Sequence, residues 1–291
     1  MTSPIDQNAL YPIREVARLT GIKPITLRAW ERRYDLIEPV RTDSGHRLYT
    51  QEHIDFLNET LRLMEEGIPI SRVKAVLSEP QVHSKEDDLG TVSSSSDSDA
   101  LIYHLCLAVN QFQIHQVERL LDRLFADYSI NVLLTLLVEI EQRLKQHKNH
   151  ITALSFWHTS LLRRLSVRLH SLQTQPLLPN KRVFIQAATQ TPVWLPKLVA
   201  LFCFEQGYQP IQLDENIALE NLIEVTKLLA FHAMIFIDFT GSATAEWKVW
   251  FQHYASMRTW VFGNTGIEEK SPPSVNCELR AWPQWFKTLS V

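Results

Sequence analysis

The chain has 291 residues and a formal net charge of −3, and 45% of its residues are hydrophobic while 21% are charged. This length is sufficient for two or three domains with cores of their own, and the composition is that of a soluble globular protein. No apolar run approaches the length that crosses a bilayer, and residues 1–12 lack the basic start and apolar core of a secretory signal, so we expect a cytoplasmic protein without a membrane partner.

The first segment with a clear period is Tyr11–Leu19. Its apolar residues, among them Ile13 and Val16, have the spacing of an amphipathic helix. Thr20-Gly21 predicts the end of this helix, because glycine adopts the left-handed backbone of a helix stop. Pro24 suits the start of the next helix, where its missing N–H does no harm. The pattern predicts a helix, a tight turn and a second helix.

The second helix is predicted to direct Leu27 and Trp30 toward the first and to leave arginines on its outer face. Asp43-Ser44-Gly45 predicts a hairpin turn between a strand near Val40 and one near Leu48. An arginine presents a planar fork of donors to phosphate or guanine, and a helix of this size fits the major groove of DNA. Arginines on a helix can also be a solvated face without a partner. The spacing of the whole segment favours a helix and a wing that bind one duplex.

Two motifs in this segment, TLRAWERRYDLIEP and RTDSGHRLYT, resemble the winged helix-turn-helix head of MerR-type transcription regulators. They are similar in particular to the subgroup with MlrA-like regulators and CarH-like cobalamin-dependent repressors. The resemblance covers residues 11–78. Asp35 stands where this subgroup usually has glycine, and Ser44 where a first glycine is common. The resemblance implies a recognition helix that carries Thr26, Arg28, Arg32 and Arg33, and a wing whose Arg41, His46, Arg47 and Tyr49 touch backbone phosphates.

The implied partner is double-stranded promoter or operator DNA, bound by a homodimer, with RNA polymerase and a regulatory protein as further candidate partners. Residues 26–49 contain five arginines and four acids, so the head is not strongly basic. Binding strength comes largely from neutralised phosphates, so affinity must depend on the arrangement of a few arginines and on having two heads.

Two more helices are expected to complete the head, which we place at residues 1–80. Thr50–Glu66 has a threonine cap and an apolar face, and Gly67 is expected to end it; Pro69–Leu77 predicts a shorter helix. Residues 81–99 are serine-rich and acidic and predict a flexible linker. A long dimerisation helix often follows the head in MerR proteins, and this segment does not suit one. Dimerisation is therefore expected from the C-terminal region.

Residues 100–176 predict a helical bundle, with three apolar stripes within 105–124, 132–144 and 151–169. Residues 177–291 change period. Short apolar runs at 182–185, 209–213, 233–239 and 259–262 predict strands, with helices expected at 193–205, 219–231 and 243–256 and a last one in the terminal WPQWFKTL. This alternation predicts a parallel sheet, that is, a C-terminal α/β Rossmann-like domain. The fold class is therefore multidomain, with a mainly α winged helix-turn-helix, a bundle and an α/β domain.

A bundle followed by such a sheet resembles a cobalamin-binding module, although the motif that ligates cobalt is missing. The cobalt-ligating turn of that family falls on Gln190, Pro192 and Leu195, none of which offers an imidazole or a glycine. Gln146 and Phe156-Trp157 stand where light-sensing relatives carry the residues above the corrin. Asp238 replaces a serine of the nucleotide tail site, and only Gly263–Gly266 is similar to the glycine-rich loop. We therefore expect a cobalamin-type domain without cofactor-binding residues and without a cofactor.

Enzyme activity is not expected, because no phosphate loop follows the first strand and no nucleophile, base and acid stand at a known spacing. Cys106, Cys203 and Cys277 lie far apart and outside any C-x-x-C spacing, which argues against zinc sites and disulfides. Two roles stay open for the C-terminal region. It senses a small molecule, a nucleotide or a corrinoid, at the carboxyl ends of its strands, or it serves only in dimerisation and protein docking.

Overall fold

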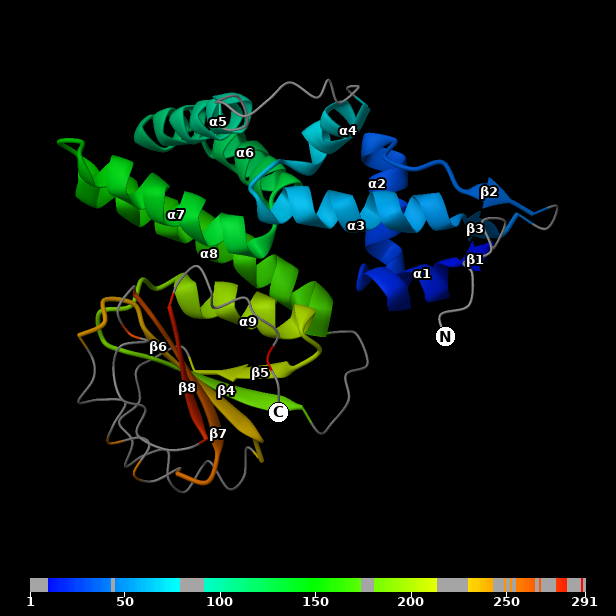
Figure 1. The fold of residues 1–291 in the computed structure, drawn as a ribbon. Helices are drawn as coiled ribbons and strands as arrows, with labels where there is room; N and C mark the ends of the chain where they lie inside the picture. Colours follow the sequence, from blue (N-terminus) through cyan, green and yellow to red (C-terminus); the bar gives the residue numbers. More distant parts are fainter. Residues whose placement is uncertain are drawn as a thin grey trace, which may run out of the picture. The chain divides into compact units, whose positions relative to one another are not determined.

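The structure is a computed structural model of the whole chain (Figure 1). It describes residues 10–42, 45–78, 92–173, 181–213, 230–242, 255–264 and 276–281, together with 249, 252, 267 and 289. The chain divides into two compact units. The first contains residues 1–102 and 122–133, and the second contains residues 103–121 and 134–291. Among the helices described, none has the length and apolar character needed to span a membrane.

The N-terminal elements form the predicted winged helix-turn-helix. In chain order they are β1 (Tyr11–Pro12), α1 (Ile13–Thr20), α2 (Pro24–Tyr34), β2 (Val40–Arg41), β3 (Arg47–Tyr49), α3 (Gln51–Glu65) and α4 (Ile70–Ser78). The strands form an antiparallel sheet in the order β1-β3-β2, so β2 and β3 are the wing hairpin. Asp43-Ser44, expected in the hairpin turn, lies outside the described residues.

Local signals in the sequence determine the bounds of these helices. Gly21 ends α1 in the left-handed region at φ 75°, with its N–H donating to the Ala17 carbonyl. Pro24 is the first residue of α2, as predicted. Thr50 caps α3 by accepting from the His53 N–H, and the His53 ring accepts from the Thr50 N–H in return.

One apolar core holds the head together. Val16 of α1, Leu27 of α2 and Leu57 of α3 are at most 2% exposed and belong to the same cluster. The apolar face of each helix is thus covered by the other two, which fixes α2 at a defined position under the wing. The outer face of α2 is left to the charged residues.

Four helices follow, α5 (Val92–Asn110), α6 (Ile114–Asp127), α7 (Ile130–Lys145) and α8 (His150–Gln173), so the apolar stripe expected within 105–124 is divided between α5 and α6. The expected linker at residues 81–99 needs a correction, because α5 already begins at Val92. Residues 79–91 lie outside the described part of the chain. The compact units also divide the bundle, since the end of α6 and the start of α7 belong with the head.

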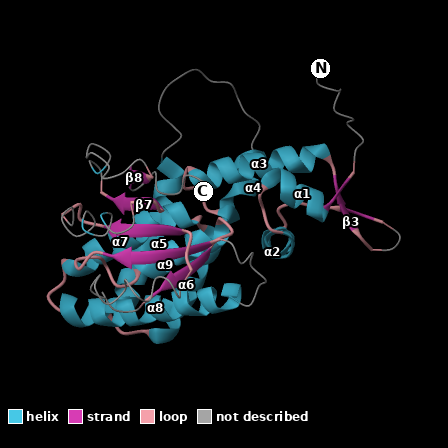
Figure 2. Ribbon diagram, turned by 90° about the horizontal axis from the view of Figure 1, so that it is seen from below, coloured by secondary structure: helices cyan, strands magenta, loops and turns pink. Residues whose placement is uncertain are grey.

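The C-terminal sheet consists of β4 (Arg182–Ala187), β5 (Gln209–Gln212), β6 (Ala233–Asp238), β7 (Arg258–Gly263) and β8 (Cys277–Ala281), with α9 (Leu195–Glu205) between β4 and β5. All pairs are parallel, in the order β5-β4-β6-β7-β8. Figure 2 shows strands of this sheet side by side as magenta arrows. The predicted parallel α/β domain is therefore confirmed, and its order is that of a doubly wound sheet. The expected helices at 219–231, 243–256 and in WPQWFKTL lie almost wholly outside the described residues.

Candidate nucleic-acid interface

The outer face of α2 presents arginines because its inner face is committed to the core. Leu27 and Trp30 are 2% and 8% exposed and point inward. Arg28, Arg32 and Arg33 are exposed on the outer face, and Thr26 is half-buried in the first turn. Arg32 and Arg33 stand in the last turn, where positive charge is favourable next to the helix dipole. Three guanidinium groups of α2 thus reach solvent, and those of Arg28 and Arg32 lie one turn apart on the same face.

The wing brings two more arginines beside α2. Arg41 on β2 and Arg47 on β3 are direct cross-strand partners. Two like charges at such a position repel one another unless a counter-charge lies nearby. His46, just before β3, is exposed, and its carbonyl accepts from the Thr42 N–H at 3.0 Å. The hairpin therefore needs an acid close to this pair of arginines.

Glu31 of α2 supplies this acid. Its Oε2 accepts from Arg47 Nε at 2.6 Å, and its Oε1 accepts from Arg41 Nη2 at 3.0 Å and from Arg47 Nη2 at 3.2 Å. The hydrogen bond to Glu31 raises the pKa of Arg47. The Glu31 side chain is 18% exposed, so this contact is partly shielded from water. Sequence analysis did not identify Glu31, which fixes the wing arginines relative to α2.

A groove of about 820 Å³ lies between α2 and the wing. Its lining includes four of the predicted DNA-contacting arginines and three acids, namely Arg28, Arg32, Arg41 and Arg47 with Glu31, Asp35 and Glu38. Ile37 and Pro39 complete the lining. Planar donors along a concave surface suit a phosphate backbone and the edges of bases. Among the predicted contacts, Thr26, Arg33 and His46 do not line this groove.

Tyr49 does not have the position that the motif implied. Its side chain is 1% exposed and belongs to the core of the head, so it cannot reach a phosphate in this conformation. Burial raises the pKa of its phenol, and the nearby Glu31 carboxylate adds to that effect. Of the predicted wing residues, Arg41, Arg47 and His46 thus reach the surface, and Tyr49 packs β3 onto the helices.

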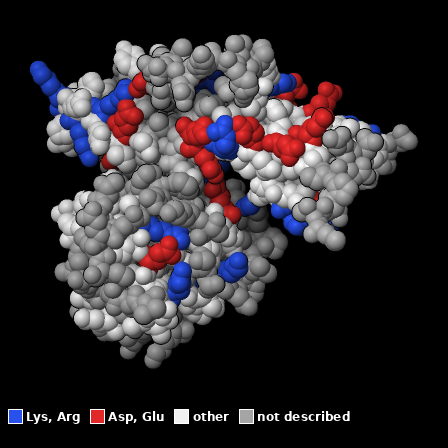
Figure 3. Space-filling view, viewed as in Figure 1, with Lys and Arg blue, Asp and Glu red and all other residues white. Residues whose placement is uncertain are grey.

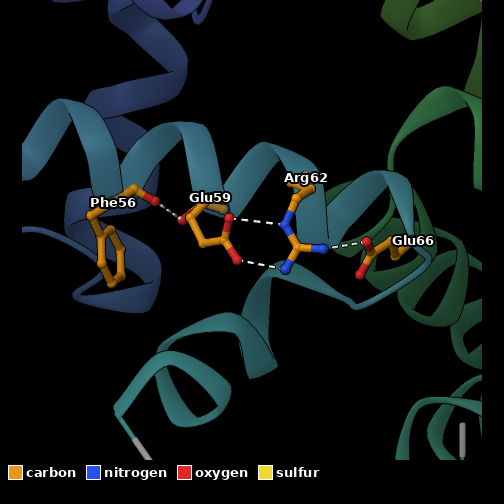
Figure 4. Close-up of polar contacts among 5 residues, drawn as sticks. Phe56, Glu59, Arg62 and Glu66 are labelled. Carbon is orange, nitrogen blue, oxygen red and sulfur yellow. Dashed lines mark hydrogen bonds and ion pairs between the residues drawn. The ribbon is translucent and has the colours of Figure 1, made fainter. Parts of the chain in front are cut away.

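The exposed face of α3 has the opposite charge. Acidic side chains gather over this helix in Figure 3. Arg62 lies among them and bonds Glu59, with Nη2 to Oε1 at 2.5 Å, and also Glu66 (Figure 4). A surface of this charge repels phosphates. Within the described head, the face suited to DNA is therefore that of α2 and the wing.

The end of α2 explains why glycine is usual at position 35 in the resembling subgroup. Asp35 caps α2 in the left-handed region, at φ 48° and ψ 41°, which favours glycine and tolerates aspartate. Lys74 of α4 donates to the Asp35 carbonyl at 2.5 Å and to its Oδ2 at 2.6 Å. Aspartate at this position therefore keeps the bend and adds, through its carboxylate, a second bond to Lys74 beside the one to the backbone carbonyl.

The residues at the carboxyl end of β4 do not fit a corrin held through cobalt. Gln190 is exposed and Pro192 half-exposed in the turn after β4, and Leu195 is buried as the first residue of α9. None offers a nitrogen lone pair to a metal. Trp194 in the same turn is fully buried, and its Nε1 donates to Glu141 of α7 at 2.7 Å. This turn is thus tied directly to the bundle.

The positions expected above a corrin ring are likewise occupied by core or surface groups. Gln146, just after α7, is exposed, Phe156 of α8 is half-buried and Trp157 is fully buried.

The positions expected around the nucleotide tail are also used by the fold. Asp238 is fully buried at the end of β6, and Asn264 donates to the Thr240 carbonyl at 2.8 Å. Within the described residues, no group of three or more His, Cys, Asp and Glu could hold a metal ion.

Comparisons with known proteins agree with this geometry. The family model described as MerR HTH family regulatory protein matches residues 11–80. The HTH-type transcriptional regulator MlrA of Escherichia coli (strain K12) is 51% identical over 74 residues, which are 25% of this chain and 30% of MlrA. The HTH-type transcriptional repressor CarH of Myxococcus xanthus is 40% identical over 67 residues, or 23% of this chain and 22% of CarH.

Both matches span less than a third of the relative. Among solved structures, the methanol:cobalamin methyltransferase complex MtaBC from Methanosarcina barkeri aligns with a TM-score of 0.31 and 12% identity, over 73% of this chain and 88% of that one.

Proposed function

We propose that this chain, whose residues 11–80 form a MerR-type helix-turn-helix domain, is a sequence-specific DNA-binding transcriptional regulator. The observation that carries the proposal is the groove in which arginines of α2 and of the wing face one another. In this proposal Arg28 and Arg32 reach base edges in the major groove, and Arg41, Arg47 and His46 contact the backbone. Thr26 and Arg33 contact the flanks of the same site.

Glu31 gives the proposed interface a defined resting state. It holds Arg41 and Arg47 against α2 before DNA arrives, which reduces the number of rotamers that the guanidinium groups must give up on binding. A phosphate at the groove then competes for the same N–H donors. Because Glu31 is itself negative, it repels DNA whose phosphates do not lie directly at Arg41 and Arg47. The carboxylate therefore favours selectivity over tight binding.

The proposed active form is a homodimer. One head makes few contacts, so a specific site requires two heads on a two-fold symmetric operator. Residues beyond the head are the proposed source of self-association, and docking of RNA polymerase or of a regulatory protein is a further proposed role for them. Reaction chemistry is not part of the proposal, since the relatives named above are described as regulators.

A second candidate role, ligand sensing by the α/β domain, is favoured by its strand order. The order β5-β4-β6-β7-β8 places the switch point between β4 and β6, where folds of this kind bind ligands. Thr191 after β4 and Thr240 after β6 bring hydroxyl groups to this edge. A nucleotide is the proposed class of ligand; a corrinoid, the other class considered from the sequence, is disfavoured because Gln190, Pro192 and Leu195 after β4 offer no ligand to cobalt. A nucleotide and corrinoid panel tested by thermal shift would detect it, and no shift with any of them would count against this role.

Selection from genomic DNA tests the main proposal. Purified full-length chain is mixed with sheared genomic DNA of its source, and bound fragments are sequenced and footprinted. We expect one enriched motif with two half-sites related by two-fold symmetry. Arg28→Ala should reduce the enrichment, whereas Arg62→Ala on the acidic face of α3 should retain it. Uniform recovery of all sequences by the wild type would contradict sequence-specific binding.

A further inference from the structure

The recognition helix α2 is held at its C-terminal end by a residue from outside the head. Tyr34 is the last residue of α2, and its hydroxyl donates to Asp127 Oδ1 at 3.0 Å. Asp127 is the last residue of α6 and stands 93 positions further along the chain. It is 5% exposed, so the bond is shielded from water. The helix that carries the base-reading arginines therefore ends on a buried carboxylate of the bundle.

Asp127 is the centre of a small polar network. Ser71 of α4 donates to its Oδ2 at 3.4 Å, and Arg123, one turn earlier on α6, approaches the same oxygen at 3.4 Å. Burial, reinforced by the Asp127 charge, raises the pKa of Tyr34 to about 12. The phenol consequently remains a hydrogen-bond donor at every physiological pH. Both oxygens of the buried carboxylate thus have partners, and two of these partners belong to the head.

Two further contacts tie the same region to the other helices of the head. Asp97 of α5 forms an ion pair with Arg72 of α4, with 2.8 Å between Oδ2 and Nη1. Ser129, between α6 and α7, donates to the Met64 carbonyl at the end of α3 at 3.4 Å. Residues 122–133 accordingly belong to the same compact unit as residues 1–102. The contact of Asp127 with Tyr34 is part of an interface rather than an isolated bond.

We propose that Asp127 is a positioning residue for DNA recognition, which sets the orientation of α2 through Tyr34 and lets the bundle control operator affinity without touching DNA. This inference rests on the proposed function. Arg32 and Arg33 directly precede Tyr34 on a helix of 11 residues, so a change at its last turn displaces their guanidinium groups. Lys74, which holds Asp35, belongs to α4 and therefore to the head itself, whereas Asp127 holds Tyr34 from outside the head.

A core role alone would not produce this behaviour. If Asp127 only stabilised the fold, its loss would lower the unfolding midpoint and leave the affinity of the folded protein unchanged. A positioning role predicts a loss of affinity in protein that is fully folded, because the bound orientation of α2 must then be selected from several. Coupling of two sites through such an element commonly changes affinity by roughly 5- to 150-fold.

The test uses the full-length chain and the operator found by genomic selection. Tyr34→Phe removes one hydroxyl, and Asp127→Ala removes the carboxylate. Each should lower operator affinity by roughly 5- to 10-fold, at the lower end of the range for coupled sites. The double variant should be no worse than Asp127→Ala, because both changes break the same bond. The salt dependence should stay unchanged, because no phosphate contact is lost.

Glu118→Ala is the matched control, since this acid lies on the same helix but pairs with Arg163 of α8 at 3.1 Å. It should bind operator as the wild type does. Hydrogen exchange provides a second measurement that needs no DNA: amides in the last turn of α2 should exchange faster in Asp127→Ala, while those in the middle of α3 should not. Equal exchange in α2 would overturn the inference.

The outcomes separate the inference from the function on which it rests. Wild-type affinity in folded Tyr34→Phe and Asp127→Ala would overturn the positioning role and leave the proposed function intact. Absence of any specific binding by the wild type would overturn both. Reduced affinity together with a reduced salt slope would also count against the inference, because it would show that phosphate contacts had been lost instead.

Discussion

Removal of Arg47 from the wing should weaken binding to every DNA sequence alike. Arg47 lies on β3 beside the groove, with its side chain 29% exposed and its guanidinium held by Glu31. One phosphate contact is expected to be lost in each head, hence two in a dimer. Each neutralised phosphate contributes about 0.9 to the slope of log affinity against log salt, so Arg47→Ala should lower that slope by about 1.8.

This change in slope has a consequence that can be measured directly. Over a fourfold rise in salt, from about 50 to about 200 mM, the deficit of Arg47→Ala relative to wild type should shrink by about tenfold. Arg28→Ala should behave differently, because a base contact is worth about 1–3 kcal/mol of discrimination and carries little of the salt dependence. Its loss should reduce the preference for operator over random duplex.

Fluorescence anisotropy of labelled duplexes over a salt series measures both quantities. Operator and scrambled duplex are titrated with wild type, Arg47→Ala, Arg28→Ala and the control Arg62→Ala, whose side chain bonds Glu59 and Glu66 on α3. The control should match wild type on both duplexes. If Arg47→Ala altered sequence preference while the salt slope stayed at the wild-type value, the assignment of the wing to the backbone would be wrong.

Four further outcomes are expected. Glu141→Ala should destabilise the chain by about 1–3 kcal/mol, because the fully buried Trp194 N–H loses its acceptor. Glu139→Ala on the same helix removes a partly exposed ion pair with Arg143 and should cost under about 1 kcal/mol. Urea unfolding compares the free energies of unfolding of the two variants. Burial raises the pKa of Glu141, but hydrogen bonds from His158 and Trp194 lower it more, so the pKa in the folded chain lies below the unfolded value of 4.5. The stability contributed by the ionised carboxylate is therefore present above pH 4.5 and is lost as the pH falls through the lower folded pKa. A Glu141→Gln variant should lose less stability on acidification than the wild type. Adenosylcobalamin mixed with the protein in the dark should not remain after desalting, because Pro192 cannot ligate cobalt, and a retained corrin spectrum would contradict this. A fragment of residues 1–80 should be largely monomeric by light scattering and bind operator weakly. Fusion to a dimerising coiled coil should restore much of the affinity but not the part attributed to Asp127, which the fragment lacks. A tight dimer of the fragment would refute a C-terminal dimeriser.

The parts of the fold that follow local rules could be predicted from sequence. Gly21 and Pro24 bound their helices as expected, and Thr50 caps α3. Four of the five strands of the C-terminal sheet were predicted; β4, β6 and β7 are short apolar runs, whereas β5, Gln209–Gln212, has glutamine at both ends. The fifth, β8, was missed because Cys277–Ala281 includes Glu278 and a 4% exposed Arg280, so its composition resembles that of a loop.

The arginines of the candidate site could be predicted from the sequence, but the contacts that hold them in place could not. Glu31 counted only as an acid that reduced the charge of the head, because its role depends on β2 and β3 folding back over α2. Tyr49 was assigned to DNA through its place in a motif, whereas its burial depends on the core beneath β3. The partnership of Tyr34 with Asp127 spans 93 residues and leaves no periodic signal in the sequence.

The left-handed aspartate that ends α2 limits how this protein could be retargeted. A recognition helix is often treated as a cassette that can be transplanted between relatives to change the operator. Here the residue after the helix is anchored by Lys74, and the last residue within it by Asp127. A transplanted helix that ends in Tyr-Gly would keep its arginines, its bend and the Lys74 bond to the backbone carbonyl of position 35, but it would lose the ion pair between Lys74 and the carboxylate. A chimera that is to read the donor's operator at full strength must therefore carry position 35 and position 74 as a pair.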